Sequence, residues 1–178
     1  MVKAILLTAG FVASTLILST PPVGDVFPEL KAETLDDKSI SFPNDTKGKS
    51  TIICMAYSAD AETDLKTWYE PTYDKFIAKT GLMDDVYDVN VYFIPMFTGV
   101  KAAGADKAKS DMKKTVQDDL QPHVVVYRGK LEDYKDKLKM DDKSKPYIFV
   151  LDKEGKILFV TSGAYTEDKM DEIDEYIE

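Results

Sequence analysis

The chain has 178 residues, 44% of them hydrophobic, which is enough for one ordinary domain with a substantial core. Its 23 basic and 32 acidic side chains give a formal net charge of −9 at pH 7. Such a surface repels phosphate backbones, so we expect no nucleic acid partner. A single cysteine and a single histidine exclude an intrachain disulfide and a zinc site made from these residue types. We therefore expect neither a cofactor nor a metal.

The N-terminus differs in composition from the rest of the chain. After Lys3, the residues from Ala4 to Leu18 carry no charge. This run is shorter than the about 20 residues that span a bilayer, and its length is typical of a secretory signal. We predict a signal peptide over residues 1–22, or a signal anchor that attaches the protein to a membrane. The expected location is periplasmic or otherwise extracytoplasmic, and a cytosolic protein with an apolar N-terminus is the alternative.

The next segments indicate strands. Two short extended runs, Leu30–Thr34 and Ser39–Phe42, flank the turn-forming residues Leu35–Lys38 and predict a β-hairpin. Ser50–Tyr57 is almost continuously apolar, which is typical of a strand buried on both faces of a sheet.

A helix is predicted next, because apolar residues recur every three or four positions between Leu65 and Ile77. Pro71 should kink it, since proline lacks the amide for one helical bond. The remaining expected elements are a strand at Val89–Phe97, helices at Ala102–Leu120 and Leu131–Leu138 around a strand at His123–Tyr127, a hairpin of Tyr147–Leu151 and Lys156–Thr161, and a helix at Thr166–Ile177. Alternating strands and helices predict parallel βαβ units, here closed by an antiparallel hairpin.

This order of elements, with Pro146 just before the last hairpin, resembles the thioredoxin superfamily. The closer resemblance is to exported redoxins, the TlpA and ResA type of thiol-disulfide oxidoreductase. It is carried by Phe27–Leu30, Leu35–Phe42, Lys47–Lys49, Pro146–Ile157, Gly163 and Thr166–Asp168. The resemblance implies an α/β fold of three α/β/α layers, with an N-terminal β-hairpin extension and a mixed central sheet, over residues 25–178. It also implies a cis peptide bond before Pro146.

The resemblance places the redox motif of these relatives, C-x-x-C, in the turn Tyr57–Thr63. The two cysteine positions fall on or near Asp60 and Thr63, and neither position holds sulfur. Dithiol exchange needs one thiolate that attacks and a second thiol that resolves the mixed disulfide. The sequence therefore predicts a thioredoxin-like protein without dithiol redox activity.

Such a protein can still bind a partner. The resemblance implies a groove that holds an extended peptide beside Pro146, and we expect a peptide or protein partner and an assembly or chaperone-like role. The predicted groove residues are Ser58, Ala59, Asp60, Thr63, Lys145 and Pro146. A third reading is a stable exported domain used through its acidic faces.

Two residues allow a chemical interpretation beside a structural one. Asp60 could act as a ligand or acid–base group, or could simply cap the helix that follows. Cys54 could serve a divergent thiol oxidoreductase or a one-cysteine peroxidase. It lies inside the predicted buried strand, however, where a thiol has a raised pKa and little reactivity.

Overall fold

The structure, a computed structural model, describes residues 22–177. The predicted signal peptide, residues 1–22, lies outside this part of the chain except for its last residue. No helix between residues 22 and 177 is both long enough and apolar enough to cross a membrane.

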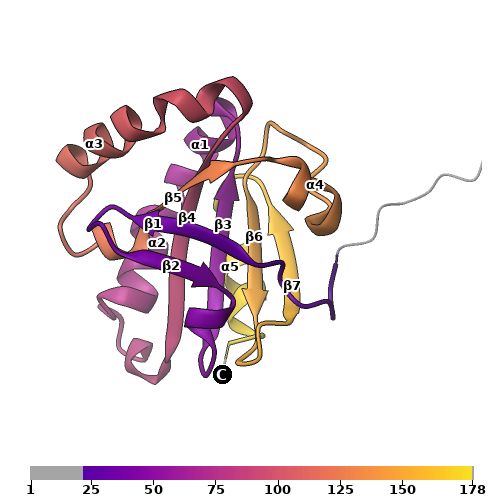
Figure 1. The fold of residues 1–178 in the computed structure, drawn as a ribbon. Helices are drawn as coiled ribbons and strands as arrows, with labels where there is room; N and C mark the ends of the chain where they lie inside the picture. The colour runs from indigo at the N-terminus through magenta and orange to yellow at the C-terminus, as the bar shows by residue number, and fades with distance from the viewer. Residues whose placement is uncertain (1–21, 178) are drawn as a thin grey trace, which may run out of the picture.

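Within the described residues, seven strands form one mixed sheet in the order β2-β1-β5-β4-β3-β6-β7 (Figure 1). The strands are β1 Leu30–Thr34, β2 Ser39–Phe42, β3 Ser50–Ala56, β4 Val89–Thr98, β5 Val125–Gly129, β6 Tyr147–Leu151 and β7 Ile157–Ser162. β3, β4 and β5 run parallel, whereas β6 is antiparallel to β3 and β7 to β6. The β1–β2 hairpin joins β5 in an antiparallel sense. The predicted mixed sheet with an added N-terminal hairpin is confirmed.

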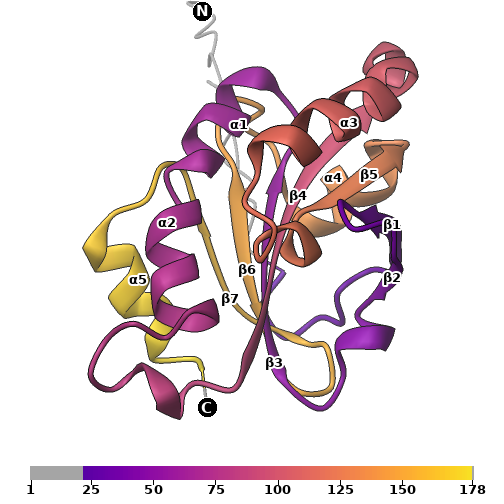
Figure 2. The ribbon, with the colours of Figure 1, turned by 90° about the vertical axis from the view of Figure 1, so that its left-hand side faces the viewer.

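Helices complete the layers. They are α1 Ala59–Lys66, α2 Tyr69–Thr72 with a π-helical continuation at Tyr73–Ile77, α3 Ala105–Thr115, α4 Glu132–Leu138 and α5 Glu167–Asp174. α1, α2 and α5 cover one face of the sheet (Figure 2). α4 packs on the other face together with Phe27, Leu30 and Phe42. The predicted three-layer α/β fold is confirmed.

The helix expected around Pro71 is interrupted one turn earlier, between α1 and α2. Proline has no N–H to donate to the carbonyl four residues before it, which weakens the helix near Thr67. The break turns the indole of Trp68 inward, where its N–H donates to the carbonyl of Gly163 over 2.9 Å. Trp68 also packs edge-on against Tyr165, with ring centroids 5.4 Å apart. The interruption thus connects the α1–α2 junction to the loop between β7 and α5.

The helix predicted over Ala102–Leu120 is shorter than expected, because α3 ends at Thr115. Val116 has an extended backbone that no longer follows the helix. The side-chain amide of Gln121 donates to the carbonyls of Lys113 and Val116 over 3.2 Å each. This buried glutamine satisfies acceptors at the end of the helix and fixes the turn that leads into β5.

β3 lies inside the sheet, between β4 and β6, and is buried throughout. Ile52, Cys54 and Ala56 pack under α1, α2 and α5, whereas Ile53 and Met55 face the opposite layer. The Cys54 side chain is 0% exposed. Burial raises the pKa of its thiol far above the usual range, because a thiolate would lose its hydration.

Cys54 should therefore react with thiol reagents only after the protein unfolds. We expect maleimide labelling of the folded protein at a rate that follows the rate of unfolding, and immediate labelling in denaturant. Mass spectrometry over time, with and without denaturant, measures both rates. Fast labelling of the folded protein would contradict the burial of β3.

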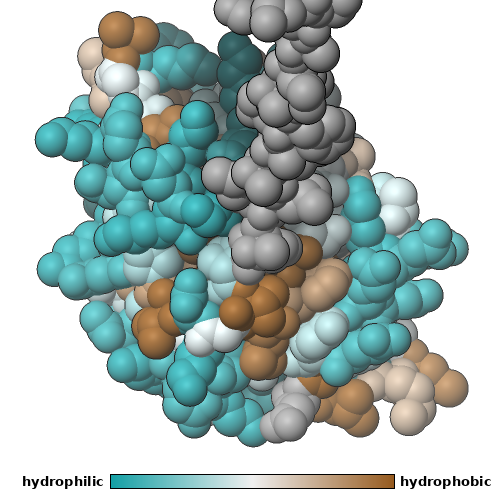
Figure 3. Space-filling model, turned by 90° about the vertical axis from the view of Figure 1, so that its right-hand side faces the viewer, coloured by the Kyte–Doolittle hydropathy of each residue, from teal (hydrophilic) through white to brown (hydrophobic). Residues whose placement is uncertain are grey.

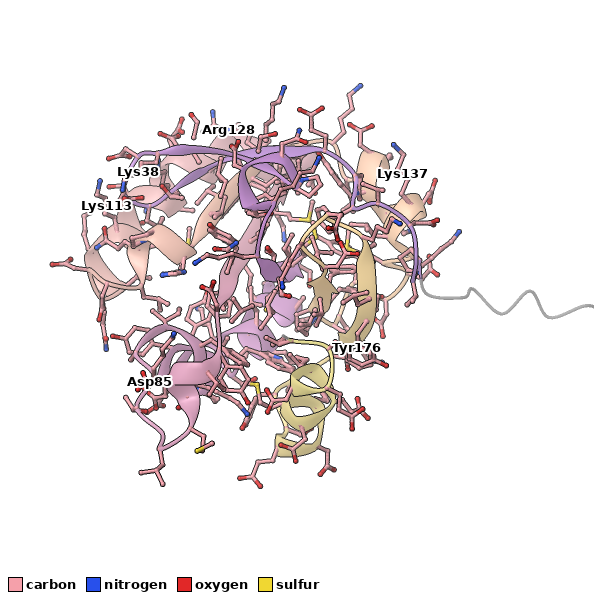
Figure 4. The ribbon with its side chains drawn as sticks, turned by 90° about the horizontal axis from the view of Figure 1, so that it is seen from below. Lys38, Asp85, Lys113, Arg128, Lys137 and Tyr176 are labelled. Atoms are coloured by element: carbon pink, nitrogen blue, oxygen red, sulfur yellow. The ribbon has the colours of Figure 1, made fainter. Side chains whose placement is uncertain are left out.

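The turn of the β1–β2 hairpin is fixed by charge. Asp37 has a positive φ of 67°, which non-glycine residues rarely adopt. Its carboxylate pairs with Lys113 and Lys109 of α3, the latter at 2.9 Å. Figure 4 shows Lys113 close to Lys38, at the corner where this turn meets α3. Hydrogen bonds from Lys113 and then Lys109 lower the pKa of Asp37 from 3.8 to about 2.

A carboxyl group whose pKa is lower in the folded protein than in the unfolded chain stabilises the fold at pH values above its ordinary pKa. This stabilisation is lost as the pH falls through the pKa of the folded protein. We expect Asp37→Asn, which tolerates the same backbone conformation, to have a lower Tm than wild type at pH 7 in low salt. The difference should shrink as pH falls from about 4 to about 2, the interval set by the two pKa values. Calorimetry on both proteins measures it, and a constant difference across this range would count against the ion pairs.

Candidate functional site

The turn between β3 and α1 contains the predicted redox-motif positions, and Ser58 organises it. The Ser58 hydroxyl accepts a hydrogen bond from the N–H of Ala61 over 3.1 Å and so caps α1. The expectation that Asp60 caps the helix is wrong, because Asp60 lies inside the first turn. There its charge is favoured by the helix dipole.

A hollow of about 430 Å³ opens above this turn. Its lining residues are Tyr57, Ser58, Ala59, Asp60, Thr98, Lys101, Leu131 and Lys143. Of the predicted groove residues, the structure brings Ser58, Ala59 and Asp60 together here. Thr63 is exposed on α1, where its hydroxyl donates to the carbonyl of Ala59 over 3.1 Å. Lys145 and Pro146 do not line the hollow.

The loop from Met140 to Lys145 separates Pro146 from the hollow. Ser58 donates its hydroxyl hydrogen to the carbonyl of Lys143, and the Tyr57 hydroxyl donates to the carbonyl of Met140 over 2.7 Å. Burial raises the pKa of Tyr57 to about 12, so the phenol keeps the proton that it donates. These two bonds hold the loop against the β3–α1 turn.

Pro146 itself differs from the expectation. Among residues 22–177 the cis peptide bond is Phe42–Pro43, so the prediction of a cis bond before Pro146 is wrong. Pro146 is buried, and its carbonyl accepts from the N–H of Gly163 over 3.0 Å. The N–H of Lys145 points back to the carbonyl of Asp142 at 3.4 Å. The N–H of Lys145 and the carbonyl of Pro146 therefore both form hydrogen bonds within the protein.

The hollow combines apolar walls with charge at its rim. Tyr57 and Leu131 supply apolar surface, and Lys101, Lys143 and Asp60 supply charged groups to the same lining. Neither lysine forms an ion pair with any residue between 22 and 177. This arrangement can accommodate an apolar segment with an acidic group. The hollow contains no thiol, because Cys54 is buried in the core.

Sequence reasoning missed Thr98, Lys101, Leu131 and Lys143. Thr98 ends β4 and Lys101 follows it, so both lie at the same end of the sheet as Ser58. The carboxyl ends of parallel strands meet at one edge, and this rule could have identified the segment after β4. No group of His, Cys, Asp and Glu in the described chain is arranged to hold a metal ion.

Ser58 offers a direct test of how this site is held. We expect Ser58→Ala to lower the free energy of unfolding by about 1–2 kcal/mol, because it removes a helix cap and a bond to the 140–145 loop. Thr63→Ala, on the same helix, should cost less than about 0.5 kcal/mol, since its exposed hydroxyl only bonds its own helix. Urea titration of both variants gives the comparison, and equal losses would contradict the role of Ser58.

Solved structures share this fold at low sequence identity. The exposed lipoprotein thioredoxin Etrx1 from Streptococcus pneumoniae strain TIGR4 is 17% identical with a TM-score of 0.56, covering 83% of this chain and 98% of its own. A putative thiol:disulfide interchange protein DsbE from Chlorobium tepidum is 14% identical, with a TM-score of 0.56 and coverages of 86% and 94%. BsSco, of the Sco family of cytochrome c oxidase assembly proteins, is 13% identical, with a TM-score of 0.57 and coverages of 89% and 95%. The thioredoxin-like fold is thereby established.

Sequence comparison identifies the family more directly. No curated protein sequence matches the chain. A family model, ATP-synt_10, described as ATP10 protein, matches residues 24–177. Because this match covers nearly all of the described residues, the chain belongs to the ATP10 protein family.

Proposed function

We propose that this protein binds a peptide or protein partner in the hollow above the β3–α1 turn and assists the assembly of a protein complex without dithiol chemistry. The observation that carries the proposal is the composition of that hollow. At the end of the sheet where related folds place two cysteines, this chain has Ser58 and Asp60 beside two unpaired lysines. Such a surface can recognise a partner but cannot exchange disulfides.

The comparisons support an assembly role. BsSco is named as a member of a family of cytochrome c oxidase assembly proteins, and the ATP-synt_10 label of the matching family refers to ATP synthase. The partner to test first is therefore a subunit of ATP synthase. We further propose that the protein works outside the cytoplasm, in line with the apolar residues 4–18 and with Etrx1, which is named as an exposed lipoprotein.

A thiol enzyme is the weaker candidate. Cys54 is buried between two layers, and the hollow that a substrate could enter lacks it. A peroxidase or oxidoreductase needs an accessible thiolate, which burial opposes. Use of the acidic faces alone would leave the lysines of the hollow without a role.

The proposal predicts that capture of the partner depends on the hollow. We expect Lys101→Glu with Lys143→Glu to lower recovery of tagged ATP synthase subunits in a pull-down by at least about tenfold, as reversal of contacting charges does at an interface. Lys47→Glu with Lys66→Glu changes the net charge equally, at two exposed lysines away from the hollow. This control should capture the subunits as well as wild type does.

The comparison is valid only if both double variants have the same Tm as the wild type. Equal capture by the two, with both folded, would refute binding in the hollow. If neither variant nor wild type captures any subunit, ATP synthase is not the partner.

A further inference from the structure

The two edges of the sheet are protected to different extents. An exposed edge strand presents unpaired N–H and C=O groups, which proteins commonly protect with short strands, charges or proline. β2, at one edge, is only four residues long. The outward N–H of Ser41 in this strand donates to the carboxylate of Asp45 over 2.8 Å. This side chain occupies a donor that another strand would need.

β7, at the opposite edge, is protected only at its beginning. The N–H of Phe27 donates to the carbonyl of Gly155, and the N–H of Ile157 donates to the carbonyl of Asp25, each over 2.9 Å. Beyond Ile157, no strand of the described chain lies outside β7. The remaining residues, Leu158–Ser162, contain neither a charge nor a proline. This stretch is an open edge that can accept another strand.

Apolar surface borders the open edge. Figure 3 views the side of the molecule on which β7 is outermost, and it shows hydrophobic residues near the centre of that side with hydrophilic residues around them. Val23 and Val26, beside the start of β7, are 55% and 59% exposed. Phe159 of β7 stacks on Tyr176, with ring centroids 4.9 Å apart and planes at 12°. Tyr176, which follows α5, is labelled in Figure 4.

The helix beside this edge determines which partner fits. Exposed carboxylates lie along α5 and directly after it, and none forms an ion pair within residues 22–177: Glu167, Asp168, Asp171, Glu172 and Glu175. Glu175 lines the same surface pocket as Leu158 of β7. A strand added to β7 would run next to this negative face. A second copy of the chain would bring two such faces together, which like-charge repulsion opposes. A basic strand would gain from the same charges.

We infer that the open edge of β7 accepts an extended, basic segment of a partner protein by strand addition. Backbone hydrogen bonds to Leu158–Ser162 would supply affinity, as in other cases where a peptide extends a sheet. Alternate side chains would cover the apolar surface on one face and place lysine or arginine toward α5 on the other. This surface is distinct from the hollow, which is lined by residues of other elements.

The probe is a fluorescent peptide of about ten residues that alternates lysine with valine, and its matched control alternates glutamate with valine. Fluorescence anisotropy with the full chain measures affinity at about 0.1 M salt, where exposed charges more than about 10 Å apart are largely screened. Hydrogen exchange locates the protected amides. We expect the lysine peptide to bind, the glutamate peptide not to bind, and protection to appear at residues 158–162. Thr161→Lys, which introduces an edge charge, should weaken binding at least about tenfold.

Charge reversal on α5 tests the basic character of the partner. Asp171→Lys with Glu172→Lys and Glu175→Lys should weaken binding of the lysine peptide at least about tenfold. A matched triple variant, Glu70→Lys with Asp85→Lys and Asp136→Lys, changes the same net charge at exposed residues elsewhere. It should stay within about threefold of wild type, because distant charges are screened by salt.

Three results would overturn the inference. One is equal weakening by the two triple variants, and another is protection of amides elsewhere than in β7. The third is protection of the β7 amides in the absence of peptide, if that protection increases with protein concentration. This result would show that a second copy occupies the edge.

Discussion

The burial of β3 on both faces is the constraint on which the molecule depends. Alternate side chains of this strand fill both layers of the core, and its backbone pairs with β4 on one side and β6 on the other. A strand enclosed in this way has no position for a charge, so the charged groups of this segment are confined to the turns at its ends. The β3–α1 turn is one such end, and Ser58 fixes its geometry there.

Most of the fold could be predicted because local pattern and tertiary environment agree. The apolar run Ser50–Tyr57 is buried, as its composition predicts. The strands Leu30–Thr34 and Ser39–Phe42 pair with the bounds predicted from the turn residues between them. Errors arose at the ends of helices, which a helical period does not determine. The side chain of Gln121 bonds carbonyls at the end of α3, a contact that is not visible in the periodicity. Pro71 is expected to kink its helix, but the missing N–H acts on the carbonyl four residues earlier, so the break lies near Thr67.

The site could be predicted only in part, for a related reason. Ser58, Ala59 and Asp60 are contiguous, so a family pattern located them together. The other side of the hollow comes from the segment after β4 and from the 140–145 loop, whose placement depends on the Tyr57 and Ser58 hydroxyls. A pattern carried over from relatives placed Pro146 beside the site. Here the 140–145 loop lies between Pro146 and the hollow. The resemblance in sequence therefore did not predict which residues are accessible at the site.

The enclosure of Cys54 also affects where the protein can be stable. A chain with one cysteine has no disulfide to lose, and a thiol without access to solvent neither gives nor takes electrons from the surrounding glutathione pool. The covalent structure of the folded protein is therefore the same in a reducing and in an oxidising medium. Its fold needs no oxidation step to form, in contrast to that of many disulfide-bonded secreted domains.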